Sequence, residues 1–192
     1  MQCVPAGDIL FCNHNTIDNS KINGDDMKLL RPSAALYNVT DITTDMLKEM
    51  GIDAILLDVD NTLAPPTEKT PYEGVREWIS EITGAGFSVV ICSNNFYKRI
   101  KPFADSVGLD CVAMSCKPLP FGFIKAKRKL HEKPRSVLVV GDQIYTDVLG
   151  ANLAGMKSVL LQPRSEEKGF SIYIRRKMEK KLRKKLYKDE VK

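Results

Sequence analysis

The apolar positions of this 192-residue chain form two kinds of pattern, which alternate along the sequence. Short runs that are apolar throughout predict buried strands, and stretches with apolar residues three or four positions apart predict helices. Val75, Trp78, Ile79 and Ile82 give the clearest helix, which Gly84 or Gly86 would end. Strands are expected at 54–58, 87–92, 111–114, 136–140 and 158–161. Helices are expected at 43–51, 75–84, 96–106, 121–132 and 146–154.

Strands that are apolar throughout and joined by helices indicate a parallel sheet covered on both faces. The prediction is therefore an α/β fold, a three-layer α/β/α arrangement around a parallel sheet of about five strands. The segment 63–71 contains three prolines and cannot be helical throughout, so it is expected to be a loop.

Composition agrees with a globular protein, since 43% of the residues are hydrophobic and 28% are charged. No apolar run has the length needed to cross a bilayer, and no basic residue precedes the short apolar run 9–12. These features predict a cytoplasmic protein. The five cysteines are odd in number and form no C-x-x-C pair, which indicates neither a zinc site nor a disulfide framework.

The chain is expected to have three parts. Residues 1–26 are polar, rich in asparagine and without a clear period, which predicts a disordered extension; Met27 would be a plausible alternative start. Residues 27–168 form the predicted domain, and residues 169–192 form a basic tail. Residues 175–192 hold ten basic and three acidic residues, a charge of +7, which leaves −2 for residues 1–174 of the total of +5.

Polar side chains follow four predicted strands at the carboxyl end, where ligands bind in open parallel sheets. They are Asp58 and Asp60, then Ser93-Asn94-Asn95, then Lys117, then Gly141-Asp142 with Asp147. Taken singly, each of these segments could instead be a turn, a helix cap or a solvated lysine. Their occurrence together indicates a phosphate site, because buried carboxylates need a cation to offset lost solvation.

These segments resemble the four motifs of the haloacid-dehalogenase-like (HAD) phosphohydrolases over residues 27–163. The matching motifs are Leu57-Asp58-Val59-Asp60-Asn61-Thr62-Leu63, Ser93-Asn94-Asn95, Lys117-Pro118, and Gly141-Asp142-Gln143 through Thr146-Asp147. In detail they are similar to the YqeG branch, which is related to the mitochondrial and plastid phosphatidylglycerophosphate phosphatases. The resemblance implies a Rossmann-like HAD fold and a phosphatase.

The resemblance also implies roles for these residues. Asp58 would be the nucleophile that forms an aspartyl-phosphate, and Asp60 would be the general acid and base. The implied ligands of Mg²⁺ are Asp58, Asp142 and the backbone carbonyl of Asp60, with Asp147 assisting. The implied phosphate-binding residues are Thr62, Ser93, Asn94 and Lys117, and Thr62 would also fix the geometry of the turn.

The gaps between the motifs are too short for a cap domain over the site. Residues 63–92 and 94–116 number 30 and 23, and each is already used by predicted elements. An open site favours a large phosphorylated substrate: a lipid at a membrane, a protein or a nucleic-acid end. A non-catalytic module that binds RNA or the ribosome is a further alternative.

The basic tail, residues 169–192, helps to choose among these substrates. Ile174, Met178, Leu182 and Leu186 recur every four residues among basic residues, a pattern typical of a helix on an anionic membrane surface. A final helix packed on the sheet is an equal alternative. Nucleic acid is a less favoured partner, because no aromatic residues interleave the basic ones. The preferred substrate is phosphatidylglycerophosphate or a similar lipid phosphate, with peripheral attachment to the inner face of the membrane.

Overall fold

The computed structural model describes residues 25–66, 68–130, 134–165 and 170–186. The predicted disorder of residues 1–26 lies outside this part, except for Asp25 and Asp26, which begin the 3₁₀ helix η2 (Asp25–Leu30). No helix among the described residues has both the length and the apolar character needed to span a bilayer.

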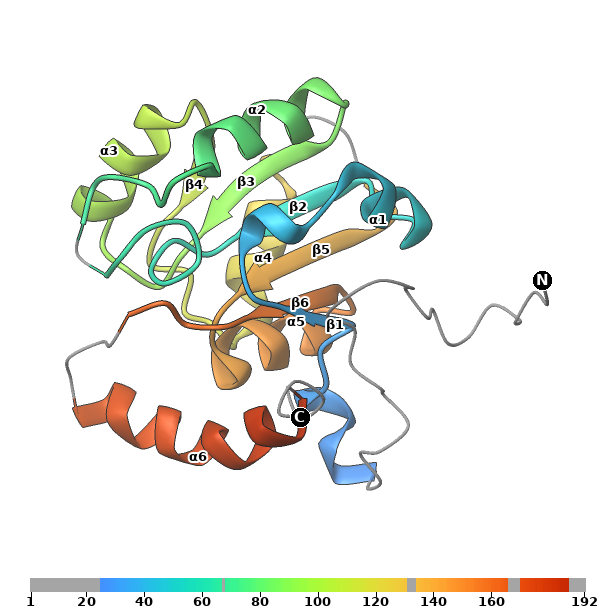
Figure 1. The fold of residues 1–192 in the computed structure, drawn as a ribbon, viewed down its shortest axis with the longest axis vertical. Helices are drawn as coiled ribbons and strands as arrows, with labels where there is room; N and C mark the ends of the chain where they lie inside the picture. The colour runs from blue at the N-terminus through green and yellow to red at the C-terminus, as the bar shows by residue number, and fades with distance from the viewer. Residues whose placement is uncertain (1–24, 67, 131–133, 166–169, 187–192) are drawn as a thin grey trace.

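The sheet is parallel and its strands lie in the order β1-β6-β5-β2-β3-β4 (Figure 1). Its strands are β1 (Ala34–Leu36), β2 (Ala54–Leu57), β3 (Ser88–Cys92), β4 (Asp110–Val112), β5 (Val137–Gly141) and β6 (Lys157–Leu161). The helices are α1 (Thr44–Glu49), α2 (Val75–Gly84), α3 (Tyr97–Ser106), α4 (Pro120–Lys127), α5 (Leu149–Leu153) and α6 (Phe170–Leu186). Two further helical turns are η3 (Val39–Asp41) and η4 (Ile144–Val148).

The α/β fold with a parallel sheet is confirmed, and the sheet has six strands where about five were expected. The additional strand, β1, is only three residues long and pairs with β6 at the edge of the sheet. Three residues are too few to show a periodic pattern, so a strand of this length is recognised only by its pairing with a neighbouring strand.

The apolar strands are buried because both faces of the sheet are covered. Ile55 and Leu57 of β2 belong to the larger core cluster, which includes residues of α2 and α3. Leu56 points to the other face, where it shares a cluster with Phe123 of α4 and Ala151 of α5. Each fully buried leucine or isoleucine contributes about 1.5–3 kcal/mol to stability.

The chain order places a topological switch point at the centre of the sheet. After β2 the chain adds β3 and β4 on one side, and then returns to place β5 and β6 on the other side. The connections after β2 and β5 therefore diverge, which opens a crevice at their carboxyl ends. The described residues between β2 and β4 form only α2, β3 and α3 besides loops, so they contain no cap domain.

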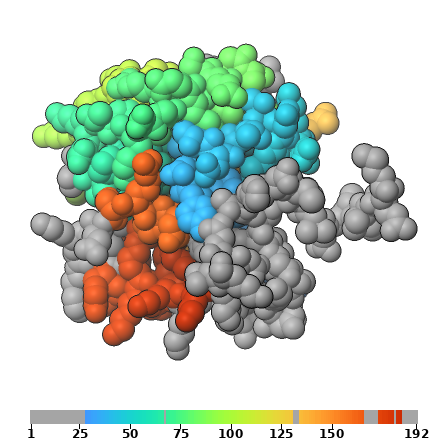
Figure 2. Space-filling view, viewed as in Figure 1, coloured from blue at the N-terminus to red at the C-terminus, as the bar shows by residue number. Residues whose placement is uncertain are grey.

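The segment after β6 returns to the body of the protein before α6 begins. Ser165 donates from its backbone N–H and its hydroxyl to Asn61 Oδ1, at 3.0 and 2.7 Å. The guanidinium of Arg164 lies over the ring of Tyr72, 4.1 Å from its centroid. Figure 2 shows this orange segment lying against the green surface, with red α6 below it. The segment thus contacts the loop that carries the first motif.

Candidate active site

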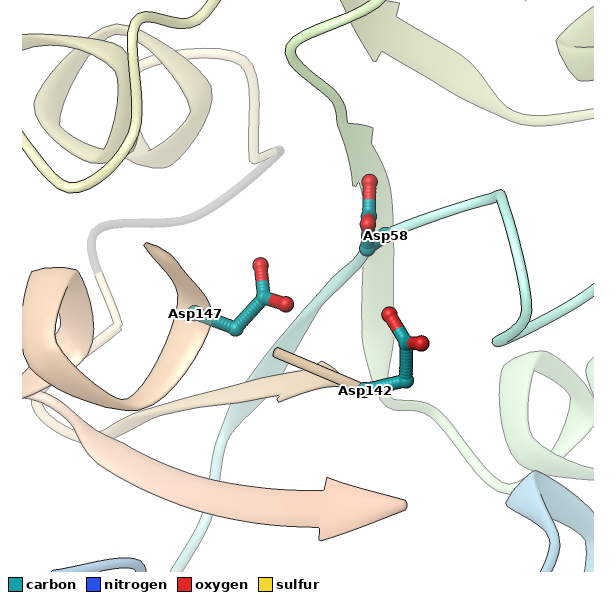
Figure 3. A group of neighbouring side chains, drawn as sticks. All are labelled: Asp58, Asp142 and Asp147. Carbon is teal, nitrogen blue, oxygen red and sulfur yellow. The ribbon is translucent and has the colours of Figure 1, made fainter. Parts of the chain in front are cut away.

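Three buried carboxylates meet at the carboxyl ends of β2 and β5. Asp58 follows β2, Asp142 follows β5, and Asp147 lies in η4, and one oxygen of each lies within 4.8 Å of the others. Figure 3 shows the three carboxylates near one another, with Asp58 and Asp142 at strand ends and Asp147 on the adjacent helical turn. The backbone N–H of Asp58 donates to the carbonyl of Val140 at 2.9 Å, which fixes the two strand ends relative to each other.

Lys117 lies among these carboxylates. Its Nζ is 3.0 Å from Asp58 Oδ1 and 2.6 Å from Asp147 Oδ1, and its side chain is 2% exposed. Burial disfavours the ammonium form, but the charges of Asp147 and Asp58 outweigh it and raise the pKa of Lys117. For Asp147, burial has the larger effect and raises the pKa to about 6, although the positive charge of Lys117 acts to lower it. Lys117 is therefore a fixed positive charge beside two carboxylates.

Asp147 reaches this position because of the local backbone. The turn η4 is a single turn of π-helix, where the sequence predicts an α-helix from residue 146. Asp147 Oδ2 accepts a hydrogen bond from the backbone N–H of Gln143 at 3.0 Å. Gly141 permits the close approach, since a Cβ at this position would overlap the Asp147 carboxylate. The glycine of the fourth motif thus makes room for its second aspartate.

Asp60 occupies a different environment from the three clustered carboxylates. Its side chain accepts from Asn95 Nδ2 at 3.0 Å and pairs with Arg99 at 3.1 Å. Neither partner was assigned a role in the predicted site. Asn95 could have been found, because it lies within the quoted second motif, whereas Arg99 lies on α3 with no signal in the sequence. Together they orient Asp60 at the edge of the site.

Asn94, a predicted phosphate-binding residue, holds Lys117 in the structure. Its Nδ2 donates to the carbonyl of Lys117 at 3.0 Å, and its Oδ1 accepts from the Lys117 N–H at 2.6 Å. Ser93 is 2% exposed, and its Oγ is 3.4 Å from the N–H of Asn95. Thr62 is buried, and its hydroxyl makes no hydrogen bond within the described part of the chain.

A pocket of about 240 Å³ collects most of the predicted residues. Its walls include the predicted residues Asp58, Asp60, Ser93, Asn94 and Lys117. Thr62, Asp142 and Asp147 are not part of its lining. Arg175 of α6 does line the pocket, although it is not among the predicted site residues. A larger pocket of about 780 Å³ lies at the opposite end of β3, away from the three clustered carboxylates.

Comparison with known proteins identifies the family. A family model described as haloacid dehalogenase-like hydrolase matches residues 45–155. The chain belongs to this family. The HAD hydrolase is 32% identical over 155 residues to Probable phosphatase YqeG of Bacillus subtilis, covering 81% of this chain and 90% of that protein. It is 27% identical over 152 residues to the mitochondrial phosphatidylglycerophosphatase GEP4 of Saccharomyces cerevisiae, covering 70% and 78%.

Among solved structures, the HAD hydrolase is similar to D,D-heptose 1.7-bisphosphate phosphatase from B. bronchiseptica, complexed with magnesium and phosphate. The TM-score is 0.47 at 21% identity, over 56% of this chain and 79% of the other. The family match and the relatives confirm the prediction of a HAD phosphatase of the YqeG type, which acts on phosphoric monoesters.

Proposed function

We propose that this phosphatase is Mg²⁺-dependent, works through an aspartyl-phosphate at Asp58, and acts on phosphatidylglycerophosphate or a similar lipid phosphate. The arrangement of Asp58, Asp142 and Asp147 around Lys117 carries the proposal. A phosphate approaching Asp58 meets carboxylates that repel it, so cations must offset that repulsion before the reaction can proceed.

The donor set suits Mg²⁺. Asp58, Asp142 and Asp147 offer three carboxylate oxygens within 4.8 Å, and Mg²⁺ is a hard cation that takes few carboxylates and keeps several waters. These three residues would hold the ion, with the backbone carbonyl of Asp60 as the fourth proposed ligand. When bound, the ion neutralises charge between the nucleophile and the phosphoryl oxygens.

The remaining steps follow from the side chains. A carboxylate oxygen of Asp58 attacks phosphorus, and the ester P–O bond breaks as Asp60 gives its proton to the leaving alkoxide. Asp60 then takes a proton from water, which attacks phosphorus and breaks the bond to Asp58, releasing inorganic phosphate. Lys117 and the Ser93 hydroxyl stabilise the charge on the phosphoryl oxygens, and Asn94 holds Lys117 in place.

Asp60→Asn is expected to lower kcat by about 10²- to 10⁴-fold, since an amide neither donates nor accepts the required proton. Phosphoenzyme should accumulate if its hydrolysis slows more than its formation. Rapid-quench kinetics would measure both steps. The matched control is Asp105→Asn, an exposed carboxylate on α3 that pairs with Lys101, and it should keep the wild-type rate. A wild-type rate in Asp60→Asn would contradict the proposed role.

Two observations support a lipid substrate. The first is an apolar rim, defined as Phe96, Tyr97, Met114, Leu119 and Phe121, each more than half exposed. Phe96 lines the pocket, and the N–H of Met114 donates to the carbonyl of Asn95 at 3.0 Å, so both segments of the rim lie at the site. Exposed apolar side chains in this number are typical of an interaction surface.

The second observation concerns α6. Leu182 of the predicted apolar stripe is half-buried against the core cluster that contains Ile144, whereas Ile174 and Met178 are exposed. The side chain of Leu186 lies outside the described residues. Lys177 and Lys180 are also exposed, so the outer face of α6 combines apolar and basic side chains. This composition suits an anionic membrane surface.

A substrate panel tests the proposed function. The enzyme should hydrolyse phosphatidylglycerophosphate in vesicles faster than phosphoserine peptides or 5′-phosphorylated oligonucleotides, and EDTA should abolish every activity until Mg²⁺ is restored. Preference for a peptide or an oligonucleotide would contradict the lipid assignment. Activity that survives EDTA would contradict the metal.

Membrane contact is tested separately, by sedimentation with phosphatidylglycerol vesicles. Combining Lys177→Gln with Lys180→Gln should weaken binding about tenfold or more, because each lysine near an anionic surface contributes about 1 kcal/mol. Lys48→Gln with Lys129→Gln removes the same charge from other exposed positions and should leave binding unchanged. Equal binding by both double variants would contradict a role for α6 at the membrane.

A further inference from the structure

Helix α6 contacts the segment that carries two of the three clustered carboxylates. Arg176 forms an ion pair with Asp142 Oδ2, and its Nη1 donates to the Asp142 carbonyl at 2.9 Å. Arg183 donates to the same carbonyl and, at 3.2 Å, to the carbonyl of Leu161. Figure 1 shows α6 running along the side of the molecule where β6 and α5 lie. The basic helix is therefore bound to the edge of the active site.

Glu179 is the centre of these contacts. Its side chain is fully buried, and Oε1 accepts from the backbone N–H groups of Ile144 at 2.7 Å and Tyr145 at 3.3 Å. Its other oxygen lies 3.1 Å from Arg183 and 3.5 Å from Arg176. A buried carboxylate is retained only when such partners replace its water. Glu179 thus satisfies the first N–H groups of η4, which have no partner within that turn.

The contacts of α6 fall on the short segment that carries two of the proposed metal ligands. Asp142 lies immediately before η4 and Asp147 lies within it. Arg176 holds the side chain and carbonyl of Asp142, while Glu179 holds the start of the turn that carries Asp147. A helix that begins almost thirty residues after Asp142 therefore contacts one of these carboxylates directly and the turn that carries the other.

We propose that Arg176 and Glu179 are positioning residues for the metal site, which they serve by fixing the carboxylates of Asp142 and Asp147. The inference rests on the proposed metal site and extends it to α6. Arg176 occupies one oxygen of Asp142, and a carboxylate can bind a second partner through its other oxygen. Outer partners of this kind orient metal ligands, and their loss typically lowers metal affinity 10- to 100-fold.

Binding of Mn²⁺ to the full chain, followed by electron paramagnetic resonance, tests this without an activity assay. Arg176→Gln and Glu179→Ala should each raise the Kd for Mn²⁺ at least about tenfold. Glu179→Gln keeps a carbonyl oxygen for the two N–H groups and should recover part of the loss. Lys184→Gln removes an exposed charge from the same helix and should leave the Kd unchanged.

The outcomes separate the inference from the proposed function. If Asp142→Asn weakens Mn²⁺ binding and the α6 variants do not, the metal site stands and the inference is wrong. If Arg176→Gln binds Mn²⁺ more tightly, Arg176 competes with the metal and the inference is also wrong. If the wild type does not bind Mn²⁺, both proposals fail. Arg176 is partly exposed, so its variant is expected to fold even if Glu179→Ala does not.

Discussion

Asp58→Asn is expected to lower kcat by about 10⁴-fold or more while the protein remains folded. The amide nitrogen and oxygen are poor nucleophiles, so the aspartyl-phosphate cannot form. The substitution also removes one of the three carboxylates that would hold the metal. Steady-state hydrolysis of an aryl phosphate measures the rate, and circular dichroism establishes that the fold is retained.

The matched control for this variant is Asp45→Asn. Asp45 is an exposed carboxylate on α1, paired with Lys48 at 3.6 Å, and its loss should change neither rate nor fold. A rate within tenfold of the wild type in Asp58→Asn would contradict the assignment of the nucleophile.

Lys117→Met is expected to affect both catalysis and stability. Loss of the buried charge that we propose stabilises the phosphoryl oxygens should lower kcat by about 10²- to 10³-fold. The substitution also leaves Asp58 and Asp147 buried without their shared cation, which should cost about 3–5 kcal/mol in EDTA. Mg²⁺ should recover part of this loss, because the ion replaces the missing positive charge.

Urea unfolding with and without Mg²⁺ measures this effect. Lys129→Met provides the control, because Lys129 is exposed and lies 3.8 Å from an exposed carboxylate. The prediction is a larger stabilisation by Mg²⁺ in Lys117→Met than in the wild type or the control. Equal stabilisation in all three proteins would show that Lys117 and the metal do not neutralise the same carboxylates.

The central strands were predictable because burial on both faces leaves continuous apolar runs. Such a run defines β2, and regular apolar spacing defines α2. The strand β1 was not predictable, since its three residues depend on pairing with β6. The π-helical form of η4 was also missed, because it depends on contacts with residues far along the chain.

The active site was likewise predictable where it depends on local sequence and not where it depends on distant contacts. Asp58, Lys117 and Asp142 could be expected together, since parallel strands end at one edge of the sheet. The sequence did not allow the partners of Asp60 or the contacts of α6 with the site to be expected. Arg99, Arg175 and Glu179 belong to helices whose sequence shows charged residues but not the side on which each one lies. Only the packing of those helices decides which charges face the site.

The most direct test of the account is chemical trapping of the phosphoenzyme. Asp60→Asn would be mixed with an aryl phosphate and Mg²⁺, quenched with acid, and reduced with borohydride, which converts an aspartyl-phosphate to homoserine. Peptide mass spectrometry should find homoserine at position 58 only when substrate is present. Homoserine at another aspartate, or phosphate on a serine such as Ser93, would contradict the proposed mechanism.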